Sequence, residues 1–222
     1  MPDIFDEVAE DLRHDQAVKL AKSYGIWLLA ACAVVLLGVG VQQGWQDHQA
    51  RQNTQAAQTF LALTNALDQP NAPQPTPGQA VQSAKALNDF AAGAPEGYKT
   101  LANLRAAALY ANAGQGPQAA ALWTGVAQDS AADPLLRDLA TLLWAQHNIG
   151  VAPDADVLAK LQPLALDGNA YHPVARELQG LIYLRQGNDA GAKLLFTQIA
   201  TDPHATDNLR TRAAALLASL NG

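Results

Sequence analysis

The chain has few side chains whose types and spacing could support catalysis. Its five histidines are far apart and show none of the short spacings that bind a metal ion. His172 stands directly before Pro173, a pattern that indicates the start of a helix rather than a metal ligand. No nucleophile elbow, phosphate-binding loop or metalloprotease helix occurs in the sequence. The histidines are His14, His48, His147, His172 and His204.

The carboxylates and the single cysteine add no further chemistry. Glu96 and Glu177 are the only glutamates after residue 46, and neither stands beside another carboxylate. Asp154 and Asp156 suit the first turn of a helix, where the backbone dipole favours negative charge. Cys32 is the only cysteine, which excludes an internal disulfide and a cysteine-based zinc site. We therefore predict a protein that is not an enzyme, with no cofactor, no metal and no small-molecule substrate.

Composition and charge narrow the class of protein further. The chain has 222 residues, of which 49% are hydrophobic and 15% charged, so a folded protein is expected. Lys and Arg number 14 against 20 Asp and Glu, which gives a net charge of −6. The basic residues form no stripe, and this argues against nucleic acid as a partner.

A membrane span is the clearest physical signal in the sequence. Residues 23–46 carry no charge, and residues 25–41 within them are almost wholly apolar. As a helix, residues 25–41 would extend about 25 Å, close to the thickness of the hydrocarbon layer. Residues 23–46 are therefore predicted to form a transmembrane helix in the lipid bilayer. A buried core helix is the alternative.

Basic residues near this span predict its orientation. Arg13, Lys19 and Lys22 precede the span, whereas Arg51 is the only Lys or Arg between it and Lys85. Loops rich in Lys and Arg tend to remain in the cytoplasm. We therefore expect a cytoplasmic N-terminus and a C-terminal domain on the other side of the membrane.

The remaining residues divide into helical segments and one loop. Residues 1–22 are predicted to be a cytoplasmic amphipathic segment, because apolar side chains recur among charges at helical spacing. Residues 47–68 are predicted to be a stalk helix with one apolar stripe. Residues 69–78 contain four prolines and are predicted to be an extended loop, followed by a helical domain over residues 79–222. The stalk stripe consists of Ala56, Phe60, Leu63 and Leu67.

The segment after the loop reads as a series of helices joined by short turns. Its apolar residues recur at helical spacing, and no run alternates in the manner of a strand. The fold class is therefore all-α, an array of helical hairpins. Helices are expected to end near Gly93, at Gly114, after Val126 and near Asn148, then to follow near residues 173–186, 189–201 and 206–220. Between them, residues 154–166 are expected to form turns interrupted by Pro163.

Two parts of this domain repeat each other at a separation of 73 residues. Tyr110 and Tyr183 have matching surroundings, with a small residue before, a glycine after and an aromatic residue further on. This pattern resembles the tetratricopeptide repeat, in which small residues let two helices approach and an aromatic ring fills the space. An alanine-rich helical bundle is the alternative. The predicted repeat-packing residues are Ala107, Tyr110, Gly114, Ala119 and Trp123 in the first copy, and Gly180, Tyr183, Gly187, Ala192 and Phe196 in the second.

A wider resemblance covers nearly the whole chain. Residues 3–17, the span with Gly44 and Trp45 at its outer end, and residues 172–178 and 186–193 are similar to one bacterial family. That family consists of single-pass inner-membrane proteins with a periplasmic tetratricopeptide-like domain, similar to the ancillary subunit of the SecYEG translocon. The resemblance implies an α-solenoid in the periplasm, and as partners translocon subunits and a membrane-anchored periplasmic chaperone related to prolyl isomerases.

The repeat alignment also predicts where a partner would bind. Apolar residues with a few charges on the inner helix face would suit exchangeable contacts with proteins. For three of the leucines, Leu104, Leu181 and Leu184, the alternative is that they fill the core. The expected function is a membrane-anchored interaction scaffold; the alternative is a structural envelope protein that self-associates through its membrane helix and stalk. The predicted groove residues are Leu101, Leu104, Arg105, Glu177, Leu181, Leu184 and Arg185.

Overall fold

The computed structural model describes residues 43, 48–65, 67 and 74–221. Over these residues the secondary structure is helical, with turns and without strands, so the all-α prediction is confirmed for this part of the chain. Apart from residue 43, the predicted span over residues 23–46 lies outside the described residues, as does the segment 1–22. Among the described residues, no helix has the length and apolar character needed to cross a membrane.

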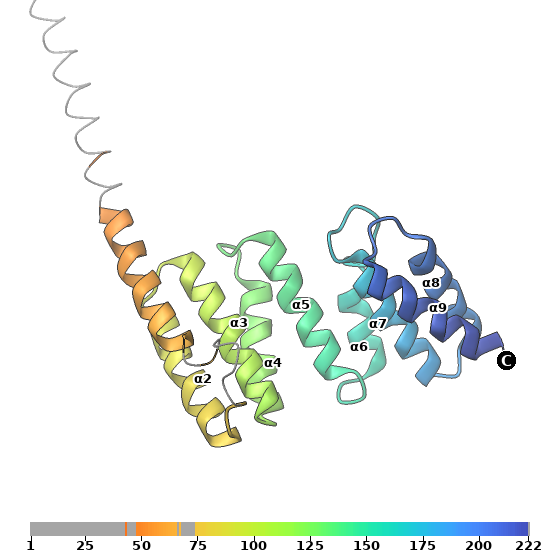
Figure 1. The fold of residues 1–222 in the computed structure, drawn as a ribbon, viewed down its shortest axis with the longest axis horizontal. Helices are drawn as coiled ribbons and strands as arrows, with labels where there is room; N and C mark the ends of the chain where they lie inside the picture. Colours follow the sequence, from red (N-terminus) through yellow and green to blue (C-terminus); the bar gives the residue numbers. More distant parts are fainter. Residues whose placement is uncertain (1–42, 44–47, 66, 68–73, 222) are drawn as a thin grey trace, which may run out of the picture. The chain divides into compact units, whose positions relative to one another are not determined.

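The chain divides into two compact units, Met1–Thr54 and Gln55–Gly222. The larger unit contains the C-terminal end of a helix over residues 48–64, followed by the helices labelled in Figure 1. Most observed helix ends lie within a few residues of the expected ones. These helices are α2 (Pro77–Ala91), α3 (Glu96–Asn112), α4 (Gly116–Gln128), α5 (Pro134–Asn148), α6 (Asp154–Leu161), α7 (His172–Arg185), α8 (Asp189–Thr201) and α9 (Asp207–Asn221).

The start of α2 corrects the predicted loop over residues 69–78. Thr76 caps the helix, because its hydroxyl accepts a hydrogen bond from the Gln79 backbone N–H at 3.4 Å. The Gln79 side chain in turn accepts from the Thr76 backbone N–H at 3.0 Å, which completes a capping box. Pro77 occupies the first helical position, where its missing N–H costs nothing. The loop therefore ends at Thr76, and the last two of its ten predicted residues belong to α2.

The predicted stalk over residues 47–68 also differs from the observed boundary. From residue 55 onward this segment belongs to the same compact unit as the hairpins. Ala56 is buried, and Phe60, Leu63 and Leu67 pack against the core between α2 and α3. The apolar stripe of the predicted stalk helix therefore packs against the helices that follow it, because burial of an apolar face is favourable.

The helices pack in the order of the sequence, as Figure 1 shows for the run from α2 to α9. Each helix contacts the next one, and the odd-numbered helices α3, α5, α7 and α9 also contact one another in turn. No such contact joins the even-numbered helices α2, α4, α6 and α8 within this unit. The odd-numbered helices thus form one closely spaced layer and the even-numbered helices a second, wider one, which is the arrangement of a helical solenoid.

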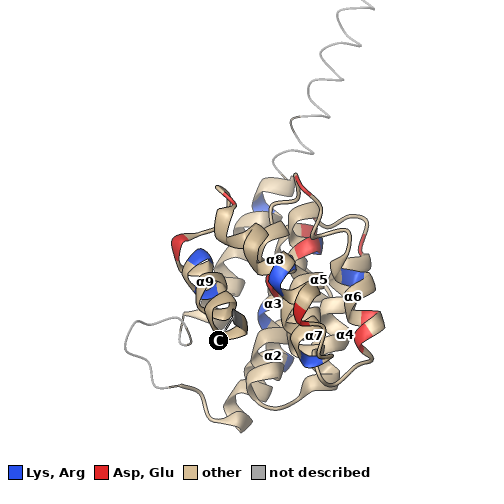
Figure 2. Ribbon diagram, turned by 90° about the vertical axis from the view of Figure 1, so that its right-hand side faces the viewer, with Lys and Arg blue, Asp and Glu red and all other residues tan. Residues whose placement is uncertain are grey.

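The core follows the same one-dimensional order. Successive clusters of buried side chains join α2 to α3, then α3 and α4 to α5, then α5 and α6 to α7, and finally α8 to α9. Among the residues that the structure describes, Trp123 and Phe196 are the largest fully buried side chains. Because these clusters follow one another along the array, each hairpin contributes to the stability of its neighbours rather than to one central core. Acidic and basic residues are interspersed over the helices, as Figure 2 shows.

Candidate partner-binding groove

The two sequence repeats become two hairpins of matching structure, α3–α4 and α7–α8. Ala107 and Gly180 occupy equivalent buried places on the first helix of each hairpin. Ala119 and Ala192 are fully buried on the second helix, and the aromatic residues that follow are 1% and 0% exposed. Tyr110 and Tyr183 are half-buried beside these residues. The structure thus brings each predicted set together within its own hairpin.

The turn inside each hairpin is also the same. Gly114 and Gly187 have φ angles of 76° and 72°, the left-handed region that favours glycine. The backbone N–H of Gln115 donates to the Tyr110 carbonyl at 2.8 Å, and that of Asn188 donates to the Tyr183 carbonyl at 2.8 Å. These bonds close the helix ends in the manner of a Schellman motif, so the spacing from tyrosine to glycine that the two copies share has one structural cause.

Gly180 lies directly against the ring of Phe196. A Cβ atom added at Gly180 would lie 2.7 Å from Cε1 and 2.8 Å from Cζ of that ring. Such distances are shorter than a carbon–carbon contact, and a fully buried ring has little room to move. The absence of a side chain at Gly180 therefore allows α7 to approach α8 as closely as it does.

Equivalent side-chain contacts link the two ends of each hairpin. The Lys99 Nζ lies 2.6 Å from the Asp129 carboxylate, and 73 residues later the His172 Nε2 lies 2.6 Å from the Asp202 carboxylate. Lys99 and His172 lie in the first turn of the first helix of each hairpin, α3 or α7. Asp129 and Asp202 directly follow the second helix, α4 or α8. The repeat therefore extends beyond the residues that revealed it in the sequence.

Hydrogen bonding determines the ionisation of these two carboxylates. The hydrogen bonds from Lys99 and from the Ala131 backbone N–H lower the pKa of Asp129. Burial raises the pKa of the Asp202 carboxyl, but hydrogen bonds from the His204 backbone N–H and from His172 outweigh it and hold that pKa below its ordinary value. Both aspartates are therefore charged near neutral pH.

His172 is held on both sides and has a structural role. Its Nδ1 lies 2.7 Å from the Asn169 carbonyl oxygen, and its Nε2 contacts Asp202. The side chain is nearly buried at the first residue of α7, as a helix-start residue would be. Within the described ranges, no three His, Cys, Asp or Glu side chains are grouped so that they could hold a metal ion.

An open groove lies between the odd-numbered helices α5, α7 and α9. Its volume is about 980 Å³, and most of its lining side chains are apolar. Helix α7 contributes its centre, where Leu181 is 37% exposed although it is a large apolar side chain. The lining residues are Gln146 of α5 and Ile149 directly after it, Val174, Glu177, Leu178 and Leu181 of α7, and Arg212, Ala215, Leu216 and Ser219 of α9.

One ion pair crosses this groove from α7 to α9. Arg212 donates from Nε and Nη2 to the two oxygens of Glu177, at 2.8 and 2.7 Å. Glu177 is 7% exposed, whereas the Arg212 side chain is more than half exposed. The hydrogen bond and the charge of Glu177 raise the pKa of Arg212. The groove therefore presents an apolar surface with one accessible, permanently charged guanidinium at its side.

The predicted groove residues do not all lie in this groove. Glu177 and Leu181 line it. Leu104 is 9% exposed and packs in the core with Trp123, so its assignment to the groove is wrong and the core alternative holds. Leu184 is half-buried against the α8–α9 core.

The remaining three predicted residues lie elsewhere on the array. Arg185 points away from the groove, because its guanidinium forms an ion pair with Asp154 at the start of α6. Leu101 is 41% exposed on α3, and Arg105 is half-buried on the same helix. Helix α5 separates α3 from α7, so these residues are not brought together with Glu177 and Leu181.

Sequence reasoning missed the contributions of α5 and α9. Gln146 and Ile149 lie in the segment between the two copies, and Arg212 and Leu216 lie after the second copy. The 73-residue register offers the signal that could have found them, because it aligns α5 with α9 and therefore places both in the same layer. The 73-residue spacing therefore indicates that α5 and α9 flank α7 in the layer of odd-numbered helices, where the groove lies.

Comparison with known proteins agrees with this geometry. The sequence model of the tetratricopeptide repeat-like domain matches residues 20–217, which is most of the chain. No curated protein and no solved structure matches the chain. The match covers both hairpins described above and the groove beside them. The chain belongs to the tetratricopeptide repeat-like domain family.

Proposed function

We propose that this protein is a membrane-anchored interaction scaffold that binds partner polypeptides in the groove between α5, α7 and α9. Domains of the tetratricopeptide type generally serve as protein-interaction modules rather than enzymes. The observation that carries the proposal is the exposed apolar centre of the groove. Leu181 is 37% exposed there, beside an ion pair that keeps Glu177 and Arg212 in place.

The shape and chemistry of the groove suit a polypeptide segment. A volume of about 980 Å³ lies at the upper end of the range for ligand pockets, and the lining from α7 is apolar apart from Glu177. Ala215 and Ser219 are small, so a side chain of a partner can reach the groove floor between α7 and α9. A mixture of apolar surface and one charge is typical of contacts that form and dissociate readily.

The resemblance of the sequence to translocon-associated proteins supports a finer proposal. In this proposal, residues 23–46 anchor the chain in the bacterial inner membrane, residues 1–22 are cytoplasmic, and the repeat domain is periplasmic. The partners are translocon subunits and a membrane-anchored periplasmic chaperone, and the domain assists protein translocation or folding. Self-association through the stalk is less well supported, because Ala56 and Phe60 of the stalk stripe pack within the same chain.

Site-specific photocrosslinking in cells tests the proposal. A photoreactive phenylalanine analogue would replace Leu181 or Ala215 in the full-length protein, with Leu194 as the matched control. Leu194 is a leucine of α8 that is 61% exposed and lies outside the groove. We expect adducts with translocon subunits or a periplasmic chaperone from both groove positions and not from the control.

A second variant separates binding in the groove from proximity alone. Leu181→Asp adds a charge beside Glu177 at an exposed position, so the fold should persist while apolar contact is lost. Crosslinking from Ala215 should then decrease strongly. Equal adducts from Leu194 and Ala215, or adducts only with a second copy of this chain, would contradict the scaffold proposal.

A further inference from the structure

The internal repeat contains one substitution that its packing does not explain. On α3, Ala106 is fully buried and packs against α2. The equivalent residue on α7, 73 positions later, is Gln179, which is half-buried. Its neighbours on the same face, Ala175 and Ile182, still pack against α6 in the core. A long polar side chain thus replaces a core alanine between two residues that remain apolar.

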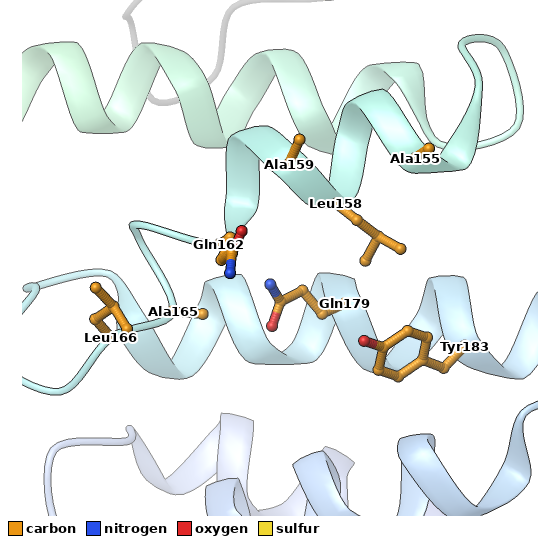
Figure 3. Close-up of a pocket in the computed structure, with 8 residues that line it drawn as sticks. All are labelled: Ala155, Leu158, Ala159, Gln162, Ala165, Leu166, Gln179 and Tyr183. Atoms are coloured by element: carbon orange, nitrogen blue, oxygen red, sulfur yellow. The ribbon is translucent and has the colours of Figure 1, made fainter.

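The space for this side chain lies beside α6, which is a short helix. Helix α6 has 8 residues, whereas α2, which covers the equivalent face of α3, has 15. Pro163 follows the end of α6, and a helix cannot readily continue through proline. A notch of about 540 Å³ lies between α6 and α7, along one face of α6 and the segment that follows it. Its lining residues, shown in Figure 3, are Ala155, Leu158, Ala159, Gln162, Ala165, Leu166, Gln179 and Tyr183.

Two carboxamides project into this notch from opposite sides. Figure 3 shows Gln162, at the end of α6, and Gln179, on α7, extending toward each other across the space. Neither side chain makes a hydrogen bond to any part of the chain that the structure describes. No residue that lines the notch carries a charge. The notch therefore offers paired donors and acceptors in neutral surroundings.

We propose that this notch is a second binding site, which takes an extended, uncharged polypeptide segment. A carboxamide has the same donor and acceptor groups as a peptide bond, so Gln162 and Gln179 can each pair with the main chain of such a segment. Leu158 and Tyr183 provide an apolar surface for one of its side chains. A charged segment would lose hydration without gaining an opposite charge.

The ends of the notch favour a polypeptide over a small polar molecule. Figure 3 places Leu166 at one end and Ala155 at the other, and both residues are exposed. A chain longer than the notch can therefore pass through it. The site is distinct from the α5–α7–α9 groove, because Gln179 lies two residues from Leu181 and hence about 200° around α7. One helix thus separates two surfaces of different chemistry.

Fluorescence polarisation with defined peptides tests this site on the full-length protein in a mild detergent. The probe is a labelled, end-blocked decapeptide that alternates Ser or Gln with Val or Leu; matched peptides carry Glu or Lys in place of Ser and Gln. We expect the neutral peptide to bind at least about tenfold more tightly than either charged peptide. Gln179→Ala should weaken binding about threefold to tenfold through the loss of its hydrogen bonds.

Three further variants make the result specific. Gln82→Ala makes the same change at an exposed position of α2 and should leave binding unchanged. Ala159→Trp should fill the notch and abolish binding, whereas Leu181→Asp in the groove should have no effect. Wild-type binding by Gln179→Ala would overturn the proposal, as would no binding of the neutral peptide. If Leu181→Asp lost binding while the notch variants retained it, the peptide would lie in the groove and the proposal would be overturned. Displacement of the peptide by maltose would indicate a sugar site and would also overturn the proposal.

Discussion

Replacing Gly180 by alanine tests the close approach of α7 to α8. The added methyl group would lie 2.7 Å from the Phe196 ring, about 1 Å closer than van der Waals contact between carbon atoms. The ring is fully buried, and overpacking of this kind typically costs about 1–3 kcal/mol. Alanine is better than glycine inside a helix by about 1 kcal/mol. We therefore expect Gly180→Ala to lower the free energy of unfolding, by up to about 2 kcal/mol.

The sign of this effect should reverse when the ring is removed. Phe196→Ala by itself should cost about 3–5 kcal/mol, because it leaves a cavity in the core of the hairpin. In that background the Gly180→Ala methyl group meets no ring, so only the gain in helix propensity of about 1 kcal/mol remains. A double-mutant cycle on the two positions would measure the difference as a coupling energy.

Urea unfolding of the full chain in a mild detergent, followed by circular dichroism, provides the measurement. Gly125→Ala is the matched control, because Gly125 lies inside α4 with no atom within 4 Å of an added Cβ. This control should gain about 1 kcal/mol. Stabilisation of Gly180→Ala equal to that of the control, or an effect that is the same with and without the Phe196 ring, would refute close packing of α7 against α8.

Three other predictions concern the turn, the ion pair and the acid response. Gly114→Ala should lose about 1–2 kcal/mol in urea unfolding because φ at this residue is 76°, whereas Gly116→Ala, two residues away without that constraint, should not. Arg212→Ala should lower the free energy of unfolding by about 1–3 kcal/mol, because the buried Glu177 carboxylate is left without its partner. Arg212→Lys should lower it less. Because the pKa of Asp202 is lowered in the folded protein, its contribution to stability is present above about pH 4 and is lost at lower pH. Asp202→Asn should therefore show a shallower fall in melting temperature below about pH 4 than the unmodified chain, and an unchanged slope would contradict this reasoning.

The repeat was readable from the sequence because its constraints are local. A glycine with positive φ, small residues where two helices meet and an aromatic ring that fills the gap each restrict a single position to a few residue types. For Gly114 and Gly187 the restriction is the backbone conformation. For Gly180 it is the approach of Phe196, thirteen residues after Tyr183 in the same hairpin. Such short-range rules also predicted the all-α class and most helix ends.

Tertiary contacts determined the two proposed binding surfaces. Leu104 and Leu181 look alike in sequence, since each is an apolar residue on the first helix of a hairpin. Leu104 packs in the core with Trp123, whereas Leu181 remains 37% exposed because the groove beside it is left open by α5 and α9. Periodicity identifies an apolar residue but not the neighbour that covers it.

Contacts between distant segments could not be predicted from the sequence, whereas local structure could. The composition and the 73-residue spacing determined that the chain forms helical hairpins of the tetratricopeptide type. Only the assembled array determined that Arg212 reaches Glu177 across 35 residues and that the helix before residue 65 packs on α2 and α3. The same holds for the notch beside Gln179, which lies between α6 and α7. Helix propensity and turn chemistry act within a few residues, whereas burial depends on which segments the whole chain brings together.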